Sequence, residues 1–406
     1  MNILVVTQYF FPETFIINDL VVEMKKQGHK VTVLTGKPNY PEGNLFPGFK
    51  SGGIQHDLYD GDVEVVRVPL RPRGKGGAKN LALNYLSFVF AASFSGPWLL
   101  RKKKCDVVFV FGTSPITVAF PAILLKWIKR VPMALWVQDL WPQSLVVTKF
   151  VRNKFLLKLV EMMVWFIYKC TDLLLVQSKT FIEPVREIVP DARPLYYPNS
   201  FKRMEVSSEV SLSGSVMRTL EDSFSVVFAG NIGKAQSVET IVEAAKLLKN
   251  VPDIKIVFVG SGSMLSWIQE QKILHGLDNV DCLGRFDISY IPLIYSKADA
   301  LLLTLNSDDI LQYTLPWKTQ SYMAAGKPII GAIDGEGARV IAESNCGLAG
   351  PAENAVVLAD NIRRLHAMSE EQRGVLGKNG MDYYEKNFEM GTQVKRLVQL
   401  FDEVRR

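Results

Sequence analysis

Cysteine is scarce in this chain, and its placement excludes the common cysteine-based sites. The 406 residues include four cysteines, Cys105, Cys170, Cys282 and Cys346, and successive ones lie more than 60 residues apart. This separation is too wide for a zinc motif, and it is typical of reduced, buried cysteines in a cytosolic protein. The four histidines are scattered as well, so no metal site is predicted.

Secretory and low-complexity features are also missing. The first residues, MNILVVTQYF, have neither the basic start nor the long apolar run of a secretory signal, and they predict a first strand. With 48% hydrophobic and 22% charged residues, the composition is that of an ordinary globular protein. Since 406 residues are many for one hydrophobic core, we expect two domains of roughly 200 residues each.

Negative charge is under-represented in the first half of the chain. Residues 1–200 hold 25 Lys and Arg against 15 Asp and Glu, and residues 201–406 hold 22 against 26, so net charges of +10 and −4 give the total of +6. The basic half is apolar and lacks a helix-turn-helix or aromatic nucleic-acid signature, which argues against a nucleic-acid partner. Its cations lie beside hydrophobic stretches, and this combination favours a membrane surface.

Short apolar, β-branched runs alternate with helix-length segments in both halves. Such strands predict parallel sheets covered on both faces, and therefore an α/β fold with two Rossmann-like domains. The polar, serine-rich segment 198–222 separates the domains. The predicted strands are Ile3–Thr7, Val31–Thr35, Val65–Pro69, Val107–Phe111, Met133–Val137, Leu173–Gln177 and Leu195–Tyr197, then Val226–Ala229, Ile256–Val259, Val280–Leu283, Ala300–Leu303 and Pro328–Gly331.

Two unusually hydrophobic helices are predicted at 80–104 and 155–168. The first is nearly long enough to span a bilayer. It lies between two strands of one predicted sheet, which argues against spanning. Two interpretations stay open: both helices are buried against the sheet, or one face dips into a membrane, helped by residues 101–104 and the basic loop 71–77.

Glycines end several predicted strands of the second half. In an open α/β sheet, ligands bind beyond the carboxyl ends of the strands, and glycine amides there can hold a phosphate. Each such end is also an ordinary strand-to-helix turn. Paired aspartates can hold a metal ion or sugar hydroxyls, although in a polar loop they are often only solvated. The candidate residues at this edge are Gly230, Gly233, Lys234, Gly260, Arg285, Phe286, Asp308 and Asp309.

A lysine stands at the start of a predicted helix in YTLPWKTQSYMAAGKPIIG, residues 313–331. Helix N-termini carry partial positive charge and disfavour a cation unless an anion faces them. One hypothesis is that Lys318 and the free amides of the helix that begins near Pro316 hold a diphosphate. The alternative is an ordinary surface lysine in a first turn.

Six stretches occur in an order seen in a known family: GHKVTVLTGKPNYPEG, QDLWPQS, YYPNSF, AGNIGKAQSVETIVEAA, VFVGSGSM and YTLPWKTQSYMAAGKPII. Together they resemble the retaining group 1 glycosyltransferases of the GT-B fold, related to glycogen synthase, and most closely the bacterial O-antigen or capsule L-fucosamine transferases. The resemblance covers nearly the whole chain. It implies two Rossmann-like domains facing a cleft: 1–200 for the acceptor, 201–386 for the nucleotide sugar, and a helix over 387–406 that crosses back.

The resemblance also implies donor contacts, with two departures. Family members carry a glutamate that grips the ribose where this chain has Ser321, and Leu315 precedes it in the same donor-binding stretch. Many members neutralise the diphosphate with an arginine and a lysine, whose positions hold Asn231 and Gln236 here. Lys234 and Lys318 are the expected substitutes.

In the first domain, two carboxylates are candidates for chemistry on the acceptor. The stretch WVQDLWP matches the place where relatives carry a histidine or acid near the reacting carbon; Gln138 takes the histidine position and leaves Asp139 ionisable. Asp139 could orient or deprotonate the acceptor hydroxyl, or simply cap the next turn. Glu13, in the loop after the first strand, is the second candidate.

The expected function is that of a retaining glycosyltransferase at the inner face of the cell membrane. The resemblance implies a UDP-sugar donor, a polyprenyl-diphosphate-linked saccharide acceptor, and no required metal or other cofactor. Two alternatives stay open. A sugar-nucleotide 2-epimerase of the same fold would need several converging acids and histidines, and a sugar-nucleotide-binding scaffold would perform no chemistry.

Overall fold

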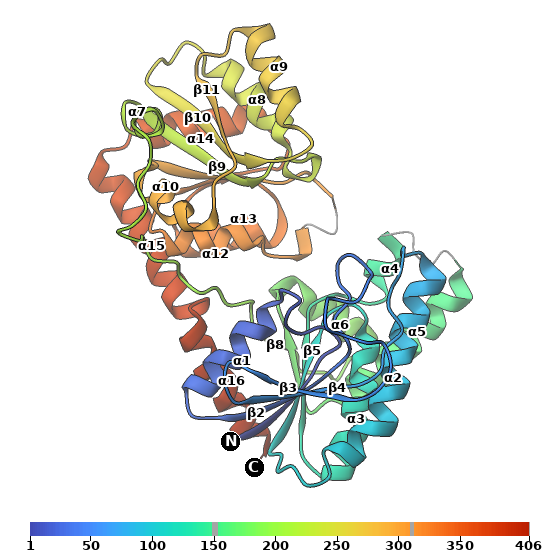
Figure 1. Cartoon of the computed structure of the whole chain (residues 1–406). Helices are drawn as coiled ribbons and strands as arrows, with labels where there is room; N and C mark the ends of the chain where they lie inside the picture. Colours follow the sequence, from blue (N-terminus) through green and yellow to red (C-terminus); the bar gives the residue numbers. More distant parts are fainter. Residues whose placement is uncertain (148–152, 309–311, 406) are drawn as a thin grey trace. The chain divides into compact units, whose positions relative to one another are not determined.

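The computed structural model describes residues 1–147, 153–308 and 312–405 of the chain (Figure 1). These residues form two compact units. The first domain comprises Met1–Asn199 together with Met390–Arg406, and the second comprises Ser200–Glu389. The chain thus returns to the first domain at Met390 rather than at residue 387.

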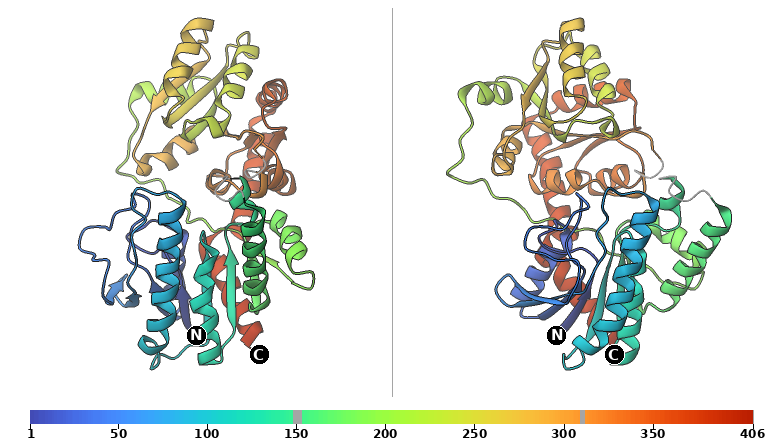
Figure 2. Two further views of the ribbon diagram at one scale, coloured as in Figure 1. Left: turned by 90° about the vertical axis from the view of Figure 1, so that its right-hand side faces the viewer. Right: turned by 45° about the vertical axis from the view of Figure 1, so that its right-hand side comes forward.

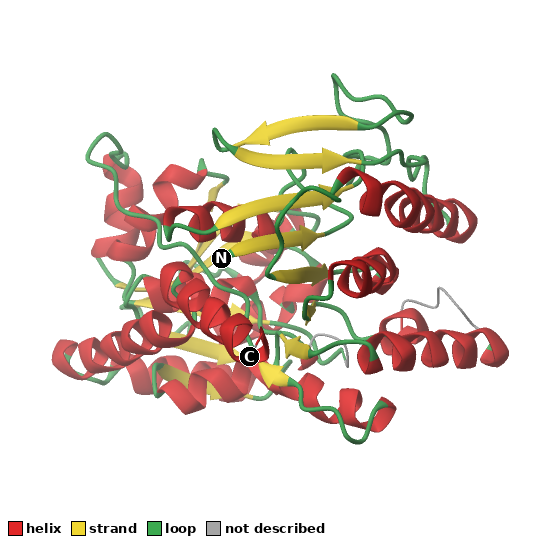
Figure 3. Cartoon of the chain, turned by 90° about the horizontal axis from the view of Figure 1, so that it is seen from below, coloured by secondary structure: helices red, strands yellow, loops and turns green. Residues whose placement is uncertain are grey.

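The first domain is built on an eight-stranded sheet with the order β3-β4-β2-β1-β5-β6-β7-β8. All neighbouring strands are parallel except β3 and β4, which pair as an antiparallel edge. Strands of this sheet are seen as yellow arrows among red helices in Figure 3. The strands are β1 (Asn2–Val6), β2 (Lys30–Thr35), β3 (Gln55–Tyr59), β4 (Val63–Arg67), β5 (Val107–Gly112), β6 (Met133–Val137), β7 (Leu173–Val176) and β8 (Leu195–Tyr196).

Helices cover both faces of this sheet, as continuous apolar strands require. One core cluster joins the sheet to α2, α3, α5 and α6, and a second joins the opposite face to α1 and α16. The C-terminal helix is therefore part of the first domain's core. The helices are α1 (Ile16–Lys26), α2 (Ala78–Leu99), α3 (Ala119–Lys129), α4 (Gln143–Val147), α5 (Lys154–Lys169), α6 (Ile182–Ile188) and α16 (Met390–Arg405), with short 3₁₀ turns at Ile116–Val118 and Lys179–Phe181.

The second domain has a six-stranded parallel sheet in the order β11-β10-β9-β12-β13-β14. A parallel sheet places all its carboxyl ends along one edge, and this edge positions the candidate site. The strands are β9 (Phe224–Asn231), β10 (Ile254–Ser261), β11 (Val280–Gly284), β12 (Ala300–Thr304), β13 (Ile329–Ala332) and β14 (Gly347–Gly350).

Helices lie on both faces of this sheet as well (Figure 1). One core cluster includes side chains of α8, α9 and α14, and the other includes side chains of α7, α10, α12, α13 and α15. The helices are α7 (Gly214–Glu221), α8 (Val238–Leu247), α9 (Leu265–His275), α10 (Ile291–Lys297), α12 (Trp317–Ala324), α13 (Gly335–Ser344), α14 (Ala355–His366) and α15 (Glu370–Asn387), with 3₁₀ turns at Lys234–Gln236 and Ile288–Tyr290.

The two hydrophobic helices are each buried on one face and exposed on another, so the interpretation that they are simply buried against the sheet holds for one face of each. In α2, Asn84, Phe88, Ala92 and Gly96 face the core, and the residues between them are exposed to different degrees. Across the described ranges, no helix combines the length and apolarity that crossing a bilayer would need.

Candidate functional site

The carboxyl ends of β9, β10 and β11 surround a cavity of about 780 Å³ in the second domain. Strands β9 and β10 run side by side to their ends, where Gly230 pairs with Gly260. A Cβ atom on Gly260 would lie 1.9 Å from the carbonyl oxygen of Gly230, so only glycine allows this approach. The cavity is lined by Gly230, Asn231, Val259, Gly260, Ser261, Arg285, Phe286, Asp287, Ile288 and Ile291.

Five residues singled out in the sequence therefore meet at one place, although they come from three strands. They are Gly230, Asn231, Gly260, Arg285 and Phe286. The alternation of strand and helix predicts this meeting, because it forces the strand ends to one edge of the sheet.

Lys318 reaches the same edge from α12. The helix begins after Pro316, and the Lys318 Nζ lies 3.7 Å from the centre of the Phe228 ring of β9. A Cβ atom on Gly230 would come within 3.2 Å of this Nζ. The ammonium group is thus beside Gly230, the next-to-last residue of β9, and the surface-lysine interpretation does not apply to it.

The Lys318 ammonium is buried, and it has no hydrogen-bond partner among the residues that the structure describes. Burial lowers the pKa of Lys318 to about 7. A buried cation without a partner is costly unless a ligand supplies the missing charge. The geometry at the end of β9 therefore suits an anion.

Asn231 and Gln236, the neutral residues at the positions of the family's arginine and lysine, contact each other. The Asn231 Nδ2 donates to the Gln236 Oε1 at 3.2 Å. Gly233 lies against this pair, since a Cβ atom there would meet the Asn231 Nδ2 at 2.9 Å. Lys234 is exposed and does not line the cavity. Of the two expected cations, Lys318 is therefore the one that the described structure places beside the cavity's glycine edge.

Two other predicted donor contacts, Leu315 and Asp308, lie elsewhere. Leu315 is buried in the hydrophobic cluster beneath α12, so its side chain is a core position. Asp308 is exposed and does not line the cavity. Asp309 lies outside the described residues. Among the described residues, no group of three or more His, Cys, Asp or Glu side chains is arranged to hold a metal ion.

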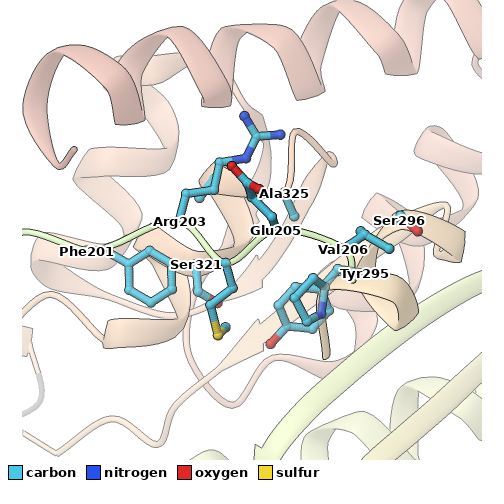
Figure 4. Close-up of a pocket in the computed structure, with 11 residues that line it drawn as sticks. Phe201, Arg203, Glu205, Val206, Tyr295, Ser296, Ser321 and Ala325 are labelled. Atoms are coloured by element: carbon cyan, nitrogen blue, oxygen red, sulfur yellow. The ribbon is translucent and has the colours of Figure 1, made fainter. Parts of the chain in front are cut away.

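Ser321 faces a second cavity of about 360 Å³, shown in Figure 4, and does not line the first. Its side chain hydrogen-bonds Tyr295, whose pKa is raised to about 12 by burial. The second cavity lies between the chain segment 201–206 and helices α10 and α12, and α10 contributes side chains to both cavities. The residues that line it are Phe201, Arg203, Met204, Glu205, Val206, Pro292, Tyr295, Ser296, Ser321, Ala324 and Ala325.

In the first domain, Glu13 holds two loops together. Its Oε1 accepts hydrogen bonds from the amides of Asn39 (2.7 Å) and Tyr40 (2.8 Å), and its Oε2 accepts one from the amide of Phe10 (3.0 Å). Burial raises the pKa of Glu13 to about 7. The carboxylate is 1% exposed, so these contacts give it a structural role rather than that of an acid open to a substrate.

Asp139 follows β6 and is partly buried. Its Oδ2 accepts a hydrogen bond from the Ser114 amide at 2.7 Å, and the Ser114 hydroxyl accepts one from the Trp141 Nε1 at 3.0 Å. The carboxylate therefore sits at the carboxyl edge of the first sheet in a fixed orientation. The neighbouring Gln138 is buried.

An aromatic and basic cluster at this edge is missing from the sequence-based candidates. The Arg73 guanidinium lies 5.1 Å from the centre of the Tyr40 ring and 5.9 Å from that of Tyr9, and Tyr85 lies close to both Arg73 and Tyr9. Arg73 and Lys75 also line a cavity of about 360 Å³. The signal in the sequence was a tyrosine just after each of the first two strands, at Tyr9 and Tyr40.

Comparisons with known proteins cover nearly all of the chain. Residues 15–200 match the family described as Glycosyl transferase 4-like domain, and residues 217–382 match Glycosyl transferases group 1. WbjE of Pseudomonas aeruginosa, described as a probable glycosyltransferase, is 25% identical over 333 residues, which are 79% of this chain and 82% of WbjE. WcaI of Escherichia coli, named for glycosyl transfer in colanic acid biosynthesis, is 21% identical over 340 residues, 80% of this chain and 82% of WcaI.

A comparison with solved structures finds the same fold. Anabaena HepE in complex with UDP aligns with a TM-score of 0.65 at 13% identity, over 99% of this chain and 100% of that chain. The predicted architecture of two α/β domains with parallel sheets, the GT-B fold, is thereby confirmed.

Proposed function

We propose that this chain, whose two halves match glycosyltransferase family models, is a group 1 glycosyltransferase that moves a sugar from a UDP-sugar to a lipid-linked saccharide with retention of configuration. The sugar is an N-acetylated amino sugar such as N-acetyl-L-fucosamine, as the sequence resemblance implies. The name of WcaI, which refers to colanic acid biosynthesis, supports a role in bacterial surface polysaccharide synthesis, including O-antigen or capsule. The HepE complex supports UDP as the nucleotide.

The observation that carries this proposal is the buried Lys318 ammonium beside Gly230. In a UDP-sugar the leaving group is a diphosphate, which gains charge as the glycosidic bond breaks. A cation in a buried site stabilises that charge more strongly than one in water. In this proposal the nucleoside lies along Gly230 and Gly260 toward Arg285 and Phe286, which line the same cavity.

The reaction in this proposal needs no metal, because Lys318 and backbone amides take its place at the diphosphate. Retention follows from displacement on the face that the diphosphate leaves, through a transition state with oxocarbenium character. The departing diphosphate assists deprotonation of the incoming hydroxyl. Asp139 at the edge of the first sheet orients that hydroxyl.

The acceptor in this proposal is a saccharide on a polyprenyl diphosphate, met at the inner face of the cell membrane. The support is the cavity lined by Arg73 and Lys75, because cations at a concave site favour a phosphorylated ligand. Tyr40 beside Arg73 is 39% exposed, so it offers an aromatic ring against which a sugar can pack.

A thermal-shift screen tests the donor assignment. At a concentration one hundred times its Kd, a ligand stabilises the fold by about 2.7 kcal/mol, so UDP-sugars at millimolar concentration should raise the melting temperature. UMP is the matched control, because it lacks the second phosphate that Lys318 would hold. If UDP-, GDP- and TDP-sugars all leave the melting temperature unchanged, the donor-site assignment is wrong.

Incubation with a UDP-sugar and membrane-extracted acceptor then tests the chemistry. Transfer should depend on the acceptor, and NMR should find the donor's anomeric configuration in the product. Conversion of UDP-N-acetylglucosamine to its 2-epimer without acceptor would identify the epimerase instead. Binding with no turnover of any donor would identify a scaffold.

A further inference from the structure

An apolar surface lies on the outer side of three helices of the first domain, and we propose that it docks on an anionic phospholipid bilayer. We call it the apolar face. Its members are the exposed side chains Leu86, Phe90, Phe94 and Trp98 of α2, Trp127 and Ile128 of α3, and Phe155, Leu156, Leu159, Met162, Trp165 and Phe166 of α5. The proposal deepens the proposed function, because a lipid-linked acceptor has to be met at a membrane.

Helix α2 is apolar on both of its sides. Its inner row, Asn84, Phe88, Ala92 and Gly96, repeats every four residues and is buried. The outer row has the same spacing, and its last three members, Phe90, Phe94 and Trp98, are 60%, 81% and 62% exposed. No charged residue occurs between Lys79 and Arg101. A helix whose outer side faces water carries polar residues there. The apolar outer row of α2 therefore indicates contact with something other than water.

Helix α5 repeats the pattern. Phe155, Leu159, Met162 and Phe166 follow one another at spacings of three or four residues, so they form one exposed stripe. Phe155 is 70% exposed. Its neighbour Asn153 caps the helix by accepting from two backbone amides, which fixes the stripe on a regular helix.

The three helices lie next to one another, so their exposed side chains form one surface. Helix α3 packs against both α2 and α5, and the Phe120 ring of α3 stacks on the Phe166 ring of α5 with centres 6.3 Å apart. The left view of Figure 2 shows α2, α3 and α5 in a row on this side of the first domain. Patches of this extent on a soluble protein mark interaction sites.

Cations and tryptophans gather where α2 and α3 end. The Arg101 guanidinium lies 4.2 Å from the centre of the Trp98 ring. The Lys129 Nζ donates to the carbonyls of Leu100 and Lys103, both at 2.8 Å, and so ties the two helix ends together. Exposed cations in this area are Arg101, Lys102, Lys104 and Arg130.

Charge and chemistry together select a bilayer as the occupant. Tryptophan and basic side chains with long apolar stems are the residues that settle between lipid tails and headgroups. The cations meet the phosphates of an anionic leaflet while the phenyl rings enter the acyl boundary. The net charge of +10 on residues 1–200 agrees with that partner and not with a second, equally basic copy of this face.

Sedimentation of the full-length protein with vesicles tests the proposal. The vesicles contain phosphatidylcholine with phosphatidylglycerol, or phosphatidylcholine alone, and no glycolipid. The protein should sediment with the mixed vesicles and more weakly with the neutral ones. Because the vesicles hold no acceptor and no nucleotide, binding here does not depend on the proposed transfer, and UDP thermal shifts on the same samples report the donor site separately.

The decisive variant is Phe90→Ser/Phe94→Ser. Each lost phenyl contact should weaken partitioning about tenfold, so the pair should weaken it roughly a hundredfold while leaving the UDP thermal shift intact. The matched control is Ile273→Ser/Leu274→Ser on α9, which removes two side chains that are 84% and 71% exposed in the second domain. It should sediment like the wild type.

A charge variant completes the test. Arg101→Gln/Lys102→Gln should weaken binding to the mixed vesicles by about fivefold per cation and should reduce the effect of salt, whereas Lys378→Gln/Lys395→Gln should change neither. Wild-type protein that stays in the supernatant, or Phe90→Ser/Phe94→Ser protein that sediments like the wild type, overturns the proposal. A concentration-dependent dimer that this variant dissolves, without vesicle binding, would also overturn it and assign the face to a second copy.

Discussion

Replacing Lys318 by methionine should stabilise the second domain and impair its donor site at once. Methionine has a similar length and no charge, so it suits the buried position beside Phe228. Burial moves the pKa of Lys318 from 10.5 to about 7, and a pKa unit corresponds to about 1.4 kcal/mol, so burying the charge costs at most about 5 kcal/mol. The cation–π contact with the Phe228 ring at 3.7 Å offsets part of this cost, on the order of 1–2 kcal/mol.

Lys318→Met should therefore raise the free energy of unfolding of the second domain by about 3 kcal/mol at pH 7. The sign of the pH dependence follows from linkage. Between about pH 7 and 10.5 the unfolded lysine is protonated and the folded one is not, so the wild type gains stability as the pH rises. The advantage of the variant is full below pH 7 and shrinks by up to about 1.4 kcal/mol per pH unit above it.

Hydrogen exchange of the β9 and β10 amides measures this stability, and calorimetric titration measures UDP binding. Loss of a buried charge-assisted hydrogen bond costs about 1.5–3 kcal/mol, so UDP should bind the variant between about tenfold and a hundredfold more weakly. Lys234→Met is the matched control, since Lys234 is exposed on the same glycine turn, and its stability should not change. An unstabilised Lys318→Met protein that binds UDP as well as the wild type would refute the reasoning.

Three further outcomes are expected. Gly260→Ala should destabilise the second domain by roughly 2 kcal/mol or more and abolish the UDP thermal shift, because its Cβ would meet the Gly230 carbonyl. The control Gly284→Ala, with open space around it, should cost only about 1 kcal/mol for its left-handed backbone. Equal effects of the two substitutions would contradict the close approach of Gly260 to Gly230. Asp139→Asn should lower kcat about a hundredfold with KM for the donor unchanged, and an unchanged kcat in a steady-state assay would remove Asp139 from the chemistry. The pKa of Glu13 is about 7 in the folded protein against 4.5 when unfolded, so the first domain should lose stability as the pH rises from 4.5 to 7. In urea unfolding, Glu13→Gln should reduce this dependence of the unfolding free energy on pH. An unchanged dependence would assign the loss of stability to other groups.

Most strands that could be predicted from the sequence are buried on both faces, although the partly exposed edge strands β8 and β11 were predicted as well. The runs at Val107–Gly112 and Met133–Val137 are continuous and apolar because helices cover both sides of them. The two missed strands are edges of their sheets. Strand β3, Gln55–Tyr59, is only partly buried and carries charged and polar residues, and β14, Gly347–Gly350, is half glycine. Neither has an apolar run to detect.

The position of the candidate donor site at the carboxyl edge of the second sheet could also be predicted from the sequence, whereas the position of Ser321 could not. Parallel topology alone brings the ends of β9, β10 and β11 together, whatever side chains they carry. Which way a side chain points from α12 depends on helix rotation and packing. Lys318 and Ser321 are three residues apart, yet one lies beside Gly230 and the other hydrogen-bonds Tyr295 in a different cavity. The rotation of α12 about its axis could therefore not be predicted from the sequence.

The return of the chain to its first domain has a consequence for biosynthesis. The second domain is an insertion between two pieces of the first, since Val394, Leu397 and Phe401 of α16 fill the same core as β1 and β5. On a ribosome the inserted domain therefore emerges whole while the earlier one still lacks part of its interior. The half that carries the most exposed apolar helices is then the last to finish folding, and it is the half for which a chaperone or an early encounter with lipid would matter most.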